Sequence, residues 1–168
     1  MTTQQIRYEQ SPLLNIRMVY PALFEDFRGA NIETYNASVY PLDVVQTNIT
    51  MSRRNVLRGI HVLPHERVMS CIHGYVFFVV VDPERELHEE FLLSDRHYLQ
   101  LVIPPNYGTG FVVLSDKALI QYIQTGFYNI NEQKTIKYND PRYNIRWPVK
   151  DPVTSRRDDA AISTILSN

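Results

Sequence analysis

The sequence predicts an all-β protein of the sandwich, jelly-roll or barrel type. Short apolar or alternating segments recur at intervals of roughly eight to twelve residues, with turn residues such as glycine, proline and asparagine between them. No segment carries the long apolar period of a surface helix. The 168 residues contain neither an internal repeat nor a low-complexity linker. We therefore expect a single domain over residues 1–168, large enough to bury its own core.

A rigid apolar wall is predicted at the centre of the fold. Tyr75–Val81 is an unbroken β-branched and aromatic run, which predicts a strand buried on both faces. Val68–Ile72 is a shorter run of the same kind, and the two are predicted to be neighbouring strands joined at Gly74. Arg58 and His61 lead into this wall, so both side chains can be held at fixed positions. A site in the mouth of a small barrel requires such rigidity.

Further strands are predicted on both sides of this wall. In chain order they are Ile16–Val19, Val44–Met51, Phe91–Leu93, Leu99–Ile103, Phe111–Leu114 and Ala118–Gln124. Residues 30–36 fit either a strand or the start of a helix, and Pro83–Glu90 is charged and turn-like, which predicts a connection. Ser155 is predicted to cap a short helix over the residues that follow it.

Polar side chains alternate along the predicted strand Val44–Met51. Gln46, Asn48 and Thr50 share one face of it, because successive strand residues point to opposite sides. Two amides side by side on a strand can read the edge of a nucleotide base or a sugar. The alternative interpretation is an exposed polar face without a ligand.

Composition excludes several classes of partner. Seventeen basic and eighteen acidic residues leave a net charge of −1, which does not predict binding to nucleic acid. The single cysteine, Cys71, cannot form an internal disulfide; we expect an inert core thiol and a reducing compartment. The N-terminus has no apolar segment typical of a signal peptide, and the longest apolar run is too short to span a membrane. We expect a soluble cytoplasmic protein without a membrane partner.

The pattern of the five histidines does not predict a metal site. A metal site in a small β-barrel would need two histidines one residue apart and a third ligand in the next hairpin. Here His61 and His65 are four residues apart, His73 precedes a glycine, and His88 and His97 fall in charged connections. The chain also has no nucleophile elbow and no glycine-rich phosphate loop. His61 is left as a candidate general base, and the alternative is a structural histidine.

Several sequence blocks together resemble one known family. In order they are FEDFRGANIETY, VQTN, NVLRGIH, VVVD, IPPNYGTGF, LIQYIQTGFY, YNDPRYNIRWP and TSRRD. Their order and spacing over about residues 20–160 resemble those of the dTDP-4-dehydrorhamnose 3,5-epimerase family. The resemblance implies a cofactor-free, cupin-type jelly roll with short flanking helices. It also implies a homodimer that epimerises nucleotide-linked 4-keto sugars in deoxysugar biosynthesis.

The resemblance also implies roles for individual residues. His61 matches the family's base, Asp158 the carboxylate that orients and charges it, and Tyr122 the acid on the opposite face of the sugar. Arg58 matches an arginine that contacts the pyrophosphate, and Asp82 the aspartate that closes the buried strand. The remaining matches are substrate-binding residues: Gln46 and Asn48 on the nucleotide side, Arg28 and Glu33 reaching the nucleotide across the dimer, and Phe127 or Tyr128 stacking on the base.

Two substitutions separate the chain from the family pattern. Arg67 stands where the family has lysine, and Thr109 where it has histidine. The loop between His61 and Arg67 is also shorter than usual. This loop and the PPN-x-G turn resemble a branch that acts on GDP-linked 4-keto heptoses for capsule or lipopolysaccharide. Both substituted residues are expected to contact the substrate, and an arginine there can stabilise an enolate but cannot readily act as an acid.

Three functional interpretations follow from these residues. The first is an epimerase that inverts C3, C5 or both centres of a nucleotide-linked 4-keto sugar. The second is a 4-keto sugar ketoisomerase, which would carry a second histidine soon after the first; Val62 and Leu63 at those positions argue against it. The third is a non-catalytic sugar-nucleotide-binding jelly roll, which the two substitutions leave open and the predicted catalytic trio opposes. The sugar, the nucleotide and the number of inverted centres remain open.

Overall fold

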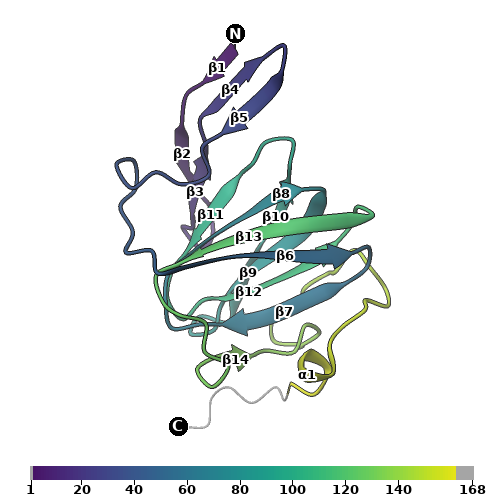
Figure 1. Ribbon diagram of the computed structural model, residues 1–168. Helices are drawn as coiled ribbons and strands as arrows, with labels where there is room; N and C mark the ends of the chain where they lie inside the picture. The colour runs from purple at the N-terminus through teal and green to yellow at the C-terminus, as the bar shows by residue number, and fades with distance from the viewer. Residues whose placement is uncertain (1, 162–168) are drawn as a thin grey trace.

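The computed structural model describes residues 2–161, and its main body is a pair of antiparallel sheets (Figure 1). One sheet has six strands, in the order β2-β3-β11-β8-β13-β6. In that order the strands are β2 (Arg7–Gln10), β3 (Arg17–Tyr20), β11 (Gln100–Ile103), β8 (Arg67–His73), β13 (Lys117–Gln124) and β6 (Gln46–Arg53). The second sheet has five strands, in the order β10-β9-β12-β7-β14. These are β10 (Leu87–Ser94), β9 (Tyr75–Asp82), β12 (Gly108–Val113), β7 (Leu57–Val62) and β14 (Lys134–Thr135).

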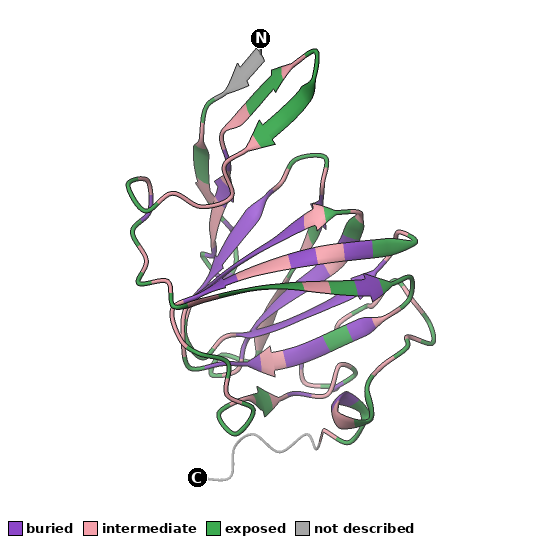
Figure 2. Ribbon diagram, in the orientation of Figure 1, coloured by how far each residue is buried: buried purple, intermediate pink, exposed green. Residues whose placement is uncertain are grey.

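The main apolar core lies between these two sheets. Phe78 of β9 stacks on Phe111 of β12, and Met69 and Ile120 from the other sheet join the same buried cluster. Cys71 belongs to this cluster, and burial raises the pKa of its thiol to about 12, as expected for an inert core cysteine. Figure 2 shows the buried residues along the strands of both sheets. The predicted all-β fold is therefore confirmed.

A third, three-stranded sheet forms an arm that projects from this body (Figure 1). It consists of β1 (Thr2–Gln4), β4 (Leu23–Asp26) and β5 (Gly29–Ile32). We call it the N-terminal arm. The β4–β5 hairpin is mainly exposed (Figure 2), and Phe27 at its tip is 97% exposed. The Arg28 guanidinium lies 5.8 Å from the centroid of the Phe27 ring.

The prediction that Val68–Ile72 and Tyr75–Val81 are neighbouring strands was wrong. They form most of β8 and β9, but β8 pairs with β11 and β13 in one sheet, and β9 pairs with β10 and β12 in the other. The chain crosses between the sheets at Gly74, where φ is +76°. A single linking residue cannot close a hairpin, which needs a loop of at least two residues.

The prediction of a connection over Pro83–Glu90 was also wrong in its second half. β10 begins at Leu87, so His88 lies in a strand, paired with Val81 of β9. The charged side chains are tolerated because β10 is at the edge of its sheet, where charge is common.

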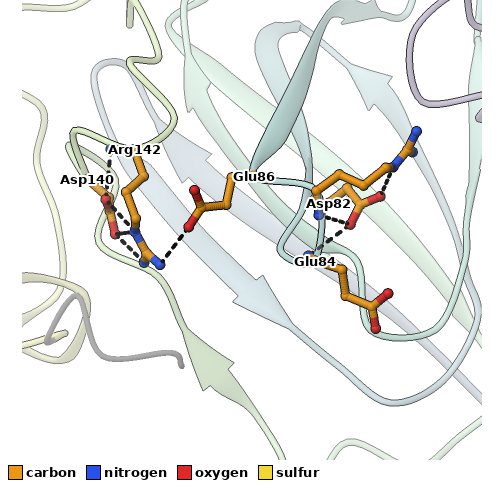
Figure 3. A network of polar contacts seen from close by, with 6 residues as sticks. Asp82, Glu84, Glu86, Asp140 and Arg142 are labelled. Carbon is orange, nitrogen blue, oxygen red and sulfur yellow. Dashed lines mark hydrogen bonds and ion pairs between the residues drawn. The ribbon is translucent and has the colours of Figure 1, made fainter. Parts of the chain in front are cut away.

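The turn between β9 and β10 is fixed by carboxylates (Figure 3). Asp82 accepts hydrogen bonds from the backbone N–H of Glu84 at 3.0 Å and of Arg85 at 3.2 Å. Glu86 contacts Arg142 at 3.4 Å, and Arg142 pairs with Asp140 at 2.7 Å, which ties the turn to a distant loop. Asp82 thus closes the buried strand, away from the pocket described below.

The short C-terminal helix begins where the sequence predicts it. It is α1 (Arg156–Asp159), and the Ser155 side chain accepts a hydrogen bond from the N–H of Asp158 at 3.1 Å. Within residues 2–161 no helix is long and apolar enough to cross a membrane.

Candidate active site

A pocket of about 430 Å³ opens between the two main sheets. The predicted residues Asn48, Arg58, His61, Arg67, Thr109 and Tyr122 all line it. They come from β6, β7, β8, β12 and β13, so both sheets contribute. The other lining residues are Ile49, Thr50, Leu63, Met69, Phe111, Gln124, Tyr128 and Gln133.

A bulge in β7 lets two side chains that are three residues apart face the same pocket. Regular alternation would send Arg58 and His61 to opposite faces. In the pairing with β12, however, Arg58 lies opposite Phe111 and His61 opposite Thr109. Two residues of β7 therefore oppose the single residue Gly110, which resets the alternation. This extra residue allows both Arg58 and His61 of the Arg-Gly-x-His motif to line the pocket.

His61 is bonded to the one acidic side chain that the sequence resemblance assigns to it. The distance from His61 Nε2 to Asp158 Oδ1 is 2.7 Å. Burial alone would raise the pKa of Asp158, but hydrogen bonds from His61, Ser155 and the Gly59 backbone hold it below its ordinary value. An ionised carboxylate can only accept, so Nε2 carries the hydrogen. Nδ1 is left as the nitrogen able to take a proton.

Tyr122 lies in the opposite sheet from His61, on β13. Burial raises the pKa of its phenol, against the hydrogen bond with Thr50 and the charges of Arg58 and Arg67, which lower it. The phenol therefore stays protonated at neutral pH and can serve as a proton donor.

Arg67 forms part of the pocket wall although its side chain is only 1% exposed. Its Nη2 donates to the Tyr107 carbonyl at 2.8 Å, and its Nη1 lies 3.5 Å from both the His61 carbonyl and Thr109 Oγ1. Its Nε has no hydrogen-bond partner in the part of the chain that the structure describes. Burial lowers the pKa of Arg67 to about 10, so it is still protonated at neutral pH.

Amide and aromatic groups lie in and beside the pocket lining, and Gln46 itself is not a lining residue. Gln46 and Asn48 share one face of β6, as predicted, and their side chains are hydrogen-bonded at 3.2 Å. Gln46 also accepts from the Tyr128 backbone at 2.8 Å, which brings Tyr128 to the lining. An adjoining hollow of about 330 Å³ shares Arg58, His61 and Tyr128 with the pocket and is also lined by Asp158. Phe127 is 72% exposed and is not among the lining residues.

Two further predicted residues lie away from the pocket of their own chain. Arg28 is in the N-terminal arm, paired with Asp26 at 2.6 Å. Glu33 follows the arm and accepts from Asn36 at 3.0 Å. Neither lines the pocket.

Several lining residues were not predicted. Strand alternation places Thr50 on the face of Asn48 and Gln124 on the face of Tyr122, but neither residue was assigned a role. Gln133 lies in an irregular segment without such a signal. Across residues 2–161 there is no group of three His, Cys, Asp or Glu side chains that could hold a metal ion.

Comparisons with known proteins identify the family of the chain. Residues 10–164 match the model of a family described as dTDP-4-dehydrorhamnose 3,5-epimerase. The enzyme of that name from Escherichia coli K12 is 36% identical over 149 residues, which cover 80% of either chain. The dTDP-4-dehydrorhamnose 3-epimerase of Streptomyces niveus is 30% identical, covering 86% of this chain and 77% of its own.

Solved structures give the same result. A 4-keto-6-deoxy sugar epimerase from the novobiocin cluster of Streptomyces spheroides superposes with a TM-score of 0.88 at 28% identity, over 96% of this chain and 88% of its own. The dTDP-6-deoxy-D-glucose-3,5-epimerase of Legionella pneumophila, solved with dTDP-4-keto-L-rhamnose, gives 0.87 at 28% identity, over 94% and 92%. The predicted cupin-type fold and epimerase activity are thereby confirmed, and the chain belongs to the dTDP-4-dehydrorhamnose 3,5-epimerase family.

Proposed function

We propose that His61 and Tyr122 carry out the epimerisation, by removing a proton from one face of a nucleotide-linked 4-keto sugar and returning one to the other. One observation carries the proposal. His61 and Tyr122 line the same pocket from opposite sheets, and Asp158 is bonded to His61. A sugar ring between these walls would have a base on one face and an acid on the other. Inversion needs this arrangement, because the new proton must arrive opposite to the one that left.

The chemistry assigns one step to each residue. The C4 ketone makes the hydrogens on C3 and C5 acidic. His61 Nδ1 accepts one of these protons, the C–H electron pair forms the C=C bond of an enolate, and the carbonyl π pair moves to the C4 oxygen. The carbonyl then re-forms while the C=C pair takes the phenolic proton of Tyr122 on the opposite face. His61 ends with one extra proton and Tyr122 with one fewer, so exchange with solvent resets both.

We propose that Arg67 stabilises the negative charge that develops on the C4 oxygen. It is buried in the pocket wall, within reach of Thr109, and is protonated at neutral pH. A preorganised donor at a developing oxyanion is typically worth about 3–4 kcal/mol. Arginine does not release its proton at working pH, so Arg67 acts by charge and hydrogen bonding alone.

The nucleotide would occupy the mouth of the pocket. We assign the pyrophosphate to Arg58 and the nucleotide contacts to Gln46 and Asn48. Tyr128 is a better candidate than Phe127 for stacking on the base, because Tyr128 lines the pocket and Phe127 does not. The Legionella relative was solved with a dTDP sugar, so dTDP-4-keto-6-deoxyglucose is the first substrate to test.

Two residues favour a second candidate substrate, a GDP-linked 4-keto heptose. Arg67 and Thr109 contact each other at 3.5 Å inside the pocket, where the family has lysine and histidine. Threonine is smaller than histidine, so room is gained for a bulkier C6 substituent. Threonine also cannot titrate near neutral pH, which removes one route for proton transfer and favours inversion of a single centre.

We further propose a homodimer in which the N-terminal arm packs on a second copy of the chain. The arm projects from the body (Figure 1), and its aromatic residues Phe24 and Phe27 are 43% and 97% exposed. Pairing of this kind would bring Arg28 and Glu33 to the partner's pocket mouth. Both residues would then contact the nucleotide.

Turnover assays test the proposed function. The protein is incubated with dTDP-4-keto-6-deoxyglucose or with a GDP-linked 4-keto heptose, and the configuration at C3 and C5 is read by NMR. We expect inversion of one or both centres in at least one substrate. Binding without inversion would favour the non-catalytic interpretation, and migration of the carbonyl to C3 would favour a ketoisomerase. Either result would overturn the proposal.

A further inference from the structure

Gln124 is a polar side chain of the pocket to which the proposed chemistry assigns no role. It is 2% exposed and lines the pocket near the end of β13. In the sheet register it lies directly opposite Arg67 of β8, and both side chains belong to the pocket wall. Side chains directly opposite on neighbouring strands have Cβ atoms about 5 Å apart, so the amide and the guanidinium are neighbours.

His65 fixes the orientation of this amide. Its Nε2 lies 3.2 Å from Gln124 Oε1, and since a carbonyl oxygen only accepts, Nε2 donates. The imidazole packs against Gly126 so closely that a Cβ on that glycine would lie 2.6 Å from the ring. The turn that contains His65 and Glu66 is also bonded to the residue after β13. The Glu66 carbonyl accepts from both the N–H and the hydroxyl of Thr125, at 3.1 and 3.2 Å.

With its oxygen bonded to His65, Gln124 turns its NH₂ group toward the pocket as a donor. Within residues 2–161 that nitrogen has no hydrogen-bond acceptor. Arg67 has only donors, and its contacts through Nη1 are long, at 3.5 Å. Thr109 Oγ1 accepts from Arg67, so the hydroxyl keeps its own hydrogen to donate. The three neighbouring groups thus offer donors, a match for an oxygen that bears negative charge and no hydrogen.

We propose that Gln124, oriented by His65, completes with Arg67 and Thr109 a three-donor site for the C4 oxygen of the sugar as the enolate forms. This inference rests on the proposed function and adds two residues to it. One contacts the reacting oxygen, and the other positions the first. Gln124 is the oxyanion-binding residue, and His65 is the positioning residue. A neutral amide donor keeps its strength across the whole pH range of the reaction, which a titrating group would not.

Two substitutions of nearly equal volume test Gln124. Gln124→Met removes the donor, and we expect kcat to fall on the order of 10²-fold with KM changed less than about threefold, because the bond strengthens only as charge develops. Gln124→Glu replaces the donor with a negatively charged hydrogen-bond acceptor, and the kcat of this variant should fall further. The thermal midpoint and the affinity for the free nucleoside diphosphate establish that each variant is folded.

His65→Ala tests the positioning role. The amide should lose its fixed orientation, and kcat should fall about tenfold with KM little changed. The double variant His65→Ala/Gln124→Met should be no slower than Gln124→Met alone, because His65 acts only through the amide. A purely structural role for His65 would make the two losses multiply, and that result would overturn the positioning role.

Gln121→Met is the matched control. Gln121 lies three residues earlier on β13, belongs to the opposite face of the strand and is absent from the pocket lining. The kcat of Gln121→Met should match that of the wild type. Light scattering checks that this variant has the same assembly mass as the wild type. Wild-type kcat in folded Gln124→Met would overturn this inference and leave the proposed function intact. Absence of turnover in the wild type would instead overturn the proposed function, and this inference with it.

Discussion

At the scale of single residues, the contact between His61 and Asp158 decides which ring nitrogen would act as the base in the proposed reaction. Asp158 is 4% exposed and ionised, and it holds the hydrogen on His61 Nε2. The His61 side chain is 29% exposed, so Nδ1 can be reached by a substrate. In the proposed reaction the carboxylate would also stabilise the imidazolium that forms when His61 takes the proton.

Asp158→Asn tests this pairing. The lowered pKa keeps Asp158 ionised at every pH above its ordinary value of 3.8, so the wild type has the charge throughout the assay range. The asparagine side chain of the variant lacks that charge and can hold the imidazole in the wrong tautomer. We therefore expect kcat to fall roughly 10²–10³-fold. Steady-state kinetics from pH 6 to 9 provide the measurement. A kcat within threefold of the wild type would show that His61 needs no orienting carboxylate.

Tyr122→Phe tests the acid. The change removes one hydroxyl from a half-buried side chain and leaves the volume nearly unchanged, so the thermal midpoint should move only slightly. Net inversion should fall about 10²-fold or more, while proton removal by His61 continues and returns the original configuration. Product NMR and exchange rates measured together distinguish the two steps. An undiminished yield of inverted product would assign reprotonation to water or to another group.

At the scale of elements, the bulge in β7 is what converts the Arg-Gly-x-His motif into a site. Gly59 has φ of +112°, and a Cβ there would lie 2.5 Å from the Thr109 carbonyl oxygen and 2.6 Å from Gly110 Cα. Only glycine fits both the backbone conformation and the space. The position of His61 over the pocket therefore depends on the residue two places before it.

Gly59→Ala should lower the free energy of unfolding by about 3–5 kcal/mol, because a backbone clash adds to the cost of a positive φ. Gly29→Ala is the matched control: its φ is +126°, but a Cβ there would meet nothing within 4 Å. The control should lose only about 1–2 kcal/mol. Chemical denaturation measures both. Equal losses in the two variants would mean that the clash at Gly59 is relieved by a small shift of β12.

Local sequence patterns predict strands better than they predict strand neighbours. The alternation of Gln46, Asn48 and Thr50 identifies β6 and its polar face correctly, since it depends only on the two-residue period of a strand. The relation of β8 to β9 was mispredicted, because pairing partners are set by the tight corner at Gly74 and by packing of the whole chain. Charge in Leu87–Glu90 concealed the start of an edge strand for a similar reason.

At the scale of the whole molecule, the site joins residues far apart in the chain. His61, Tyr122 and Asp158 reach one place only after two sheets and a C-terminal helix pack together. Spacing alone left His61 as a possible structural histidine, and the resemblance to a family was needed to select these three. Gln124 lies inside the block LIQYIQTGFY, but the resemblance assigns it no role, and Gln133 lies outside every block in an irregular segment.

The proposed dimer gives a prediction at the same scale. Phe27→Asp places a charge at the exposed tip of the N-terminal arm, and we expect self-association to weaken at least tenfold because a desolvated charge is costly in an apolar contact. Sedimentation equilibrium measures the dissociation constant. Leu92→Asp, on β10 and 55% exposed in the wild type, is the control and should associate normally. A wild-type protein that is monomeric at micromolar concentration would contradict the dimer.

The most direct test of His61 as the base measures the incorporation of deuterium from solvent into the sugar. Wild-type protein and His61→Asn are incubated in deuterated water with dTDP-4-keto-6-deoxyglucose and with the GDP-linked 4-keto heptose, and NMR locates the incorporated deuterium. We predict incorporation at C3, C5 or both with inversion in the wild type, and a loss of at least about 10²-fold in His61→Asn while the nucleoside diphosphate still binds. Undiminished incorporation in His61→Asn would show that His61 is not the base.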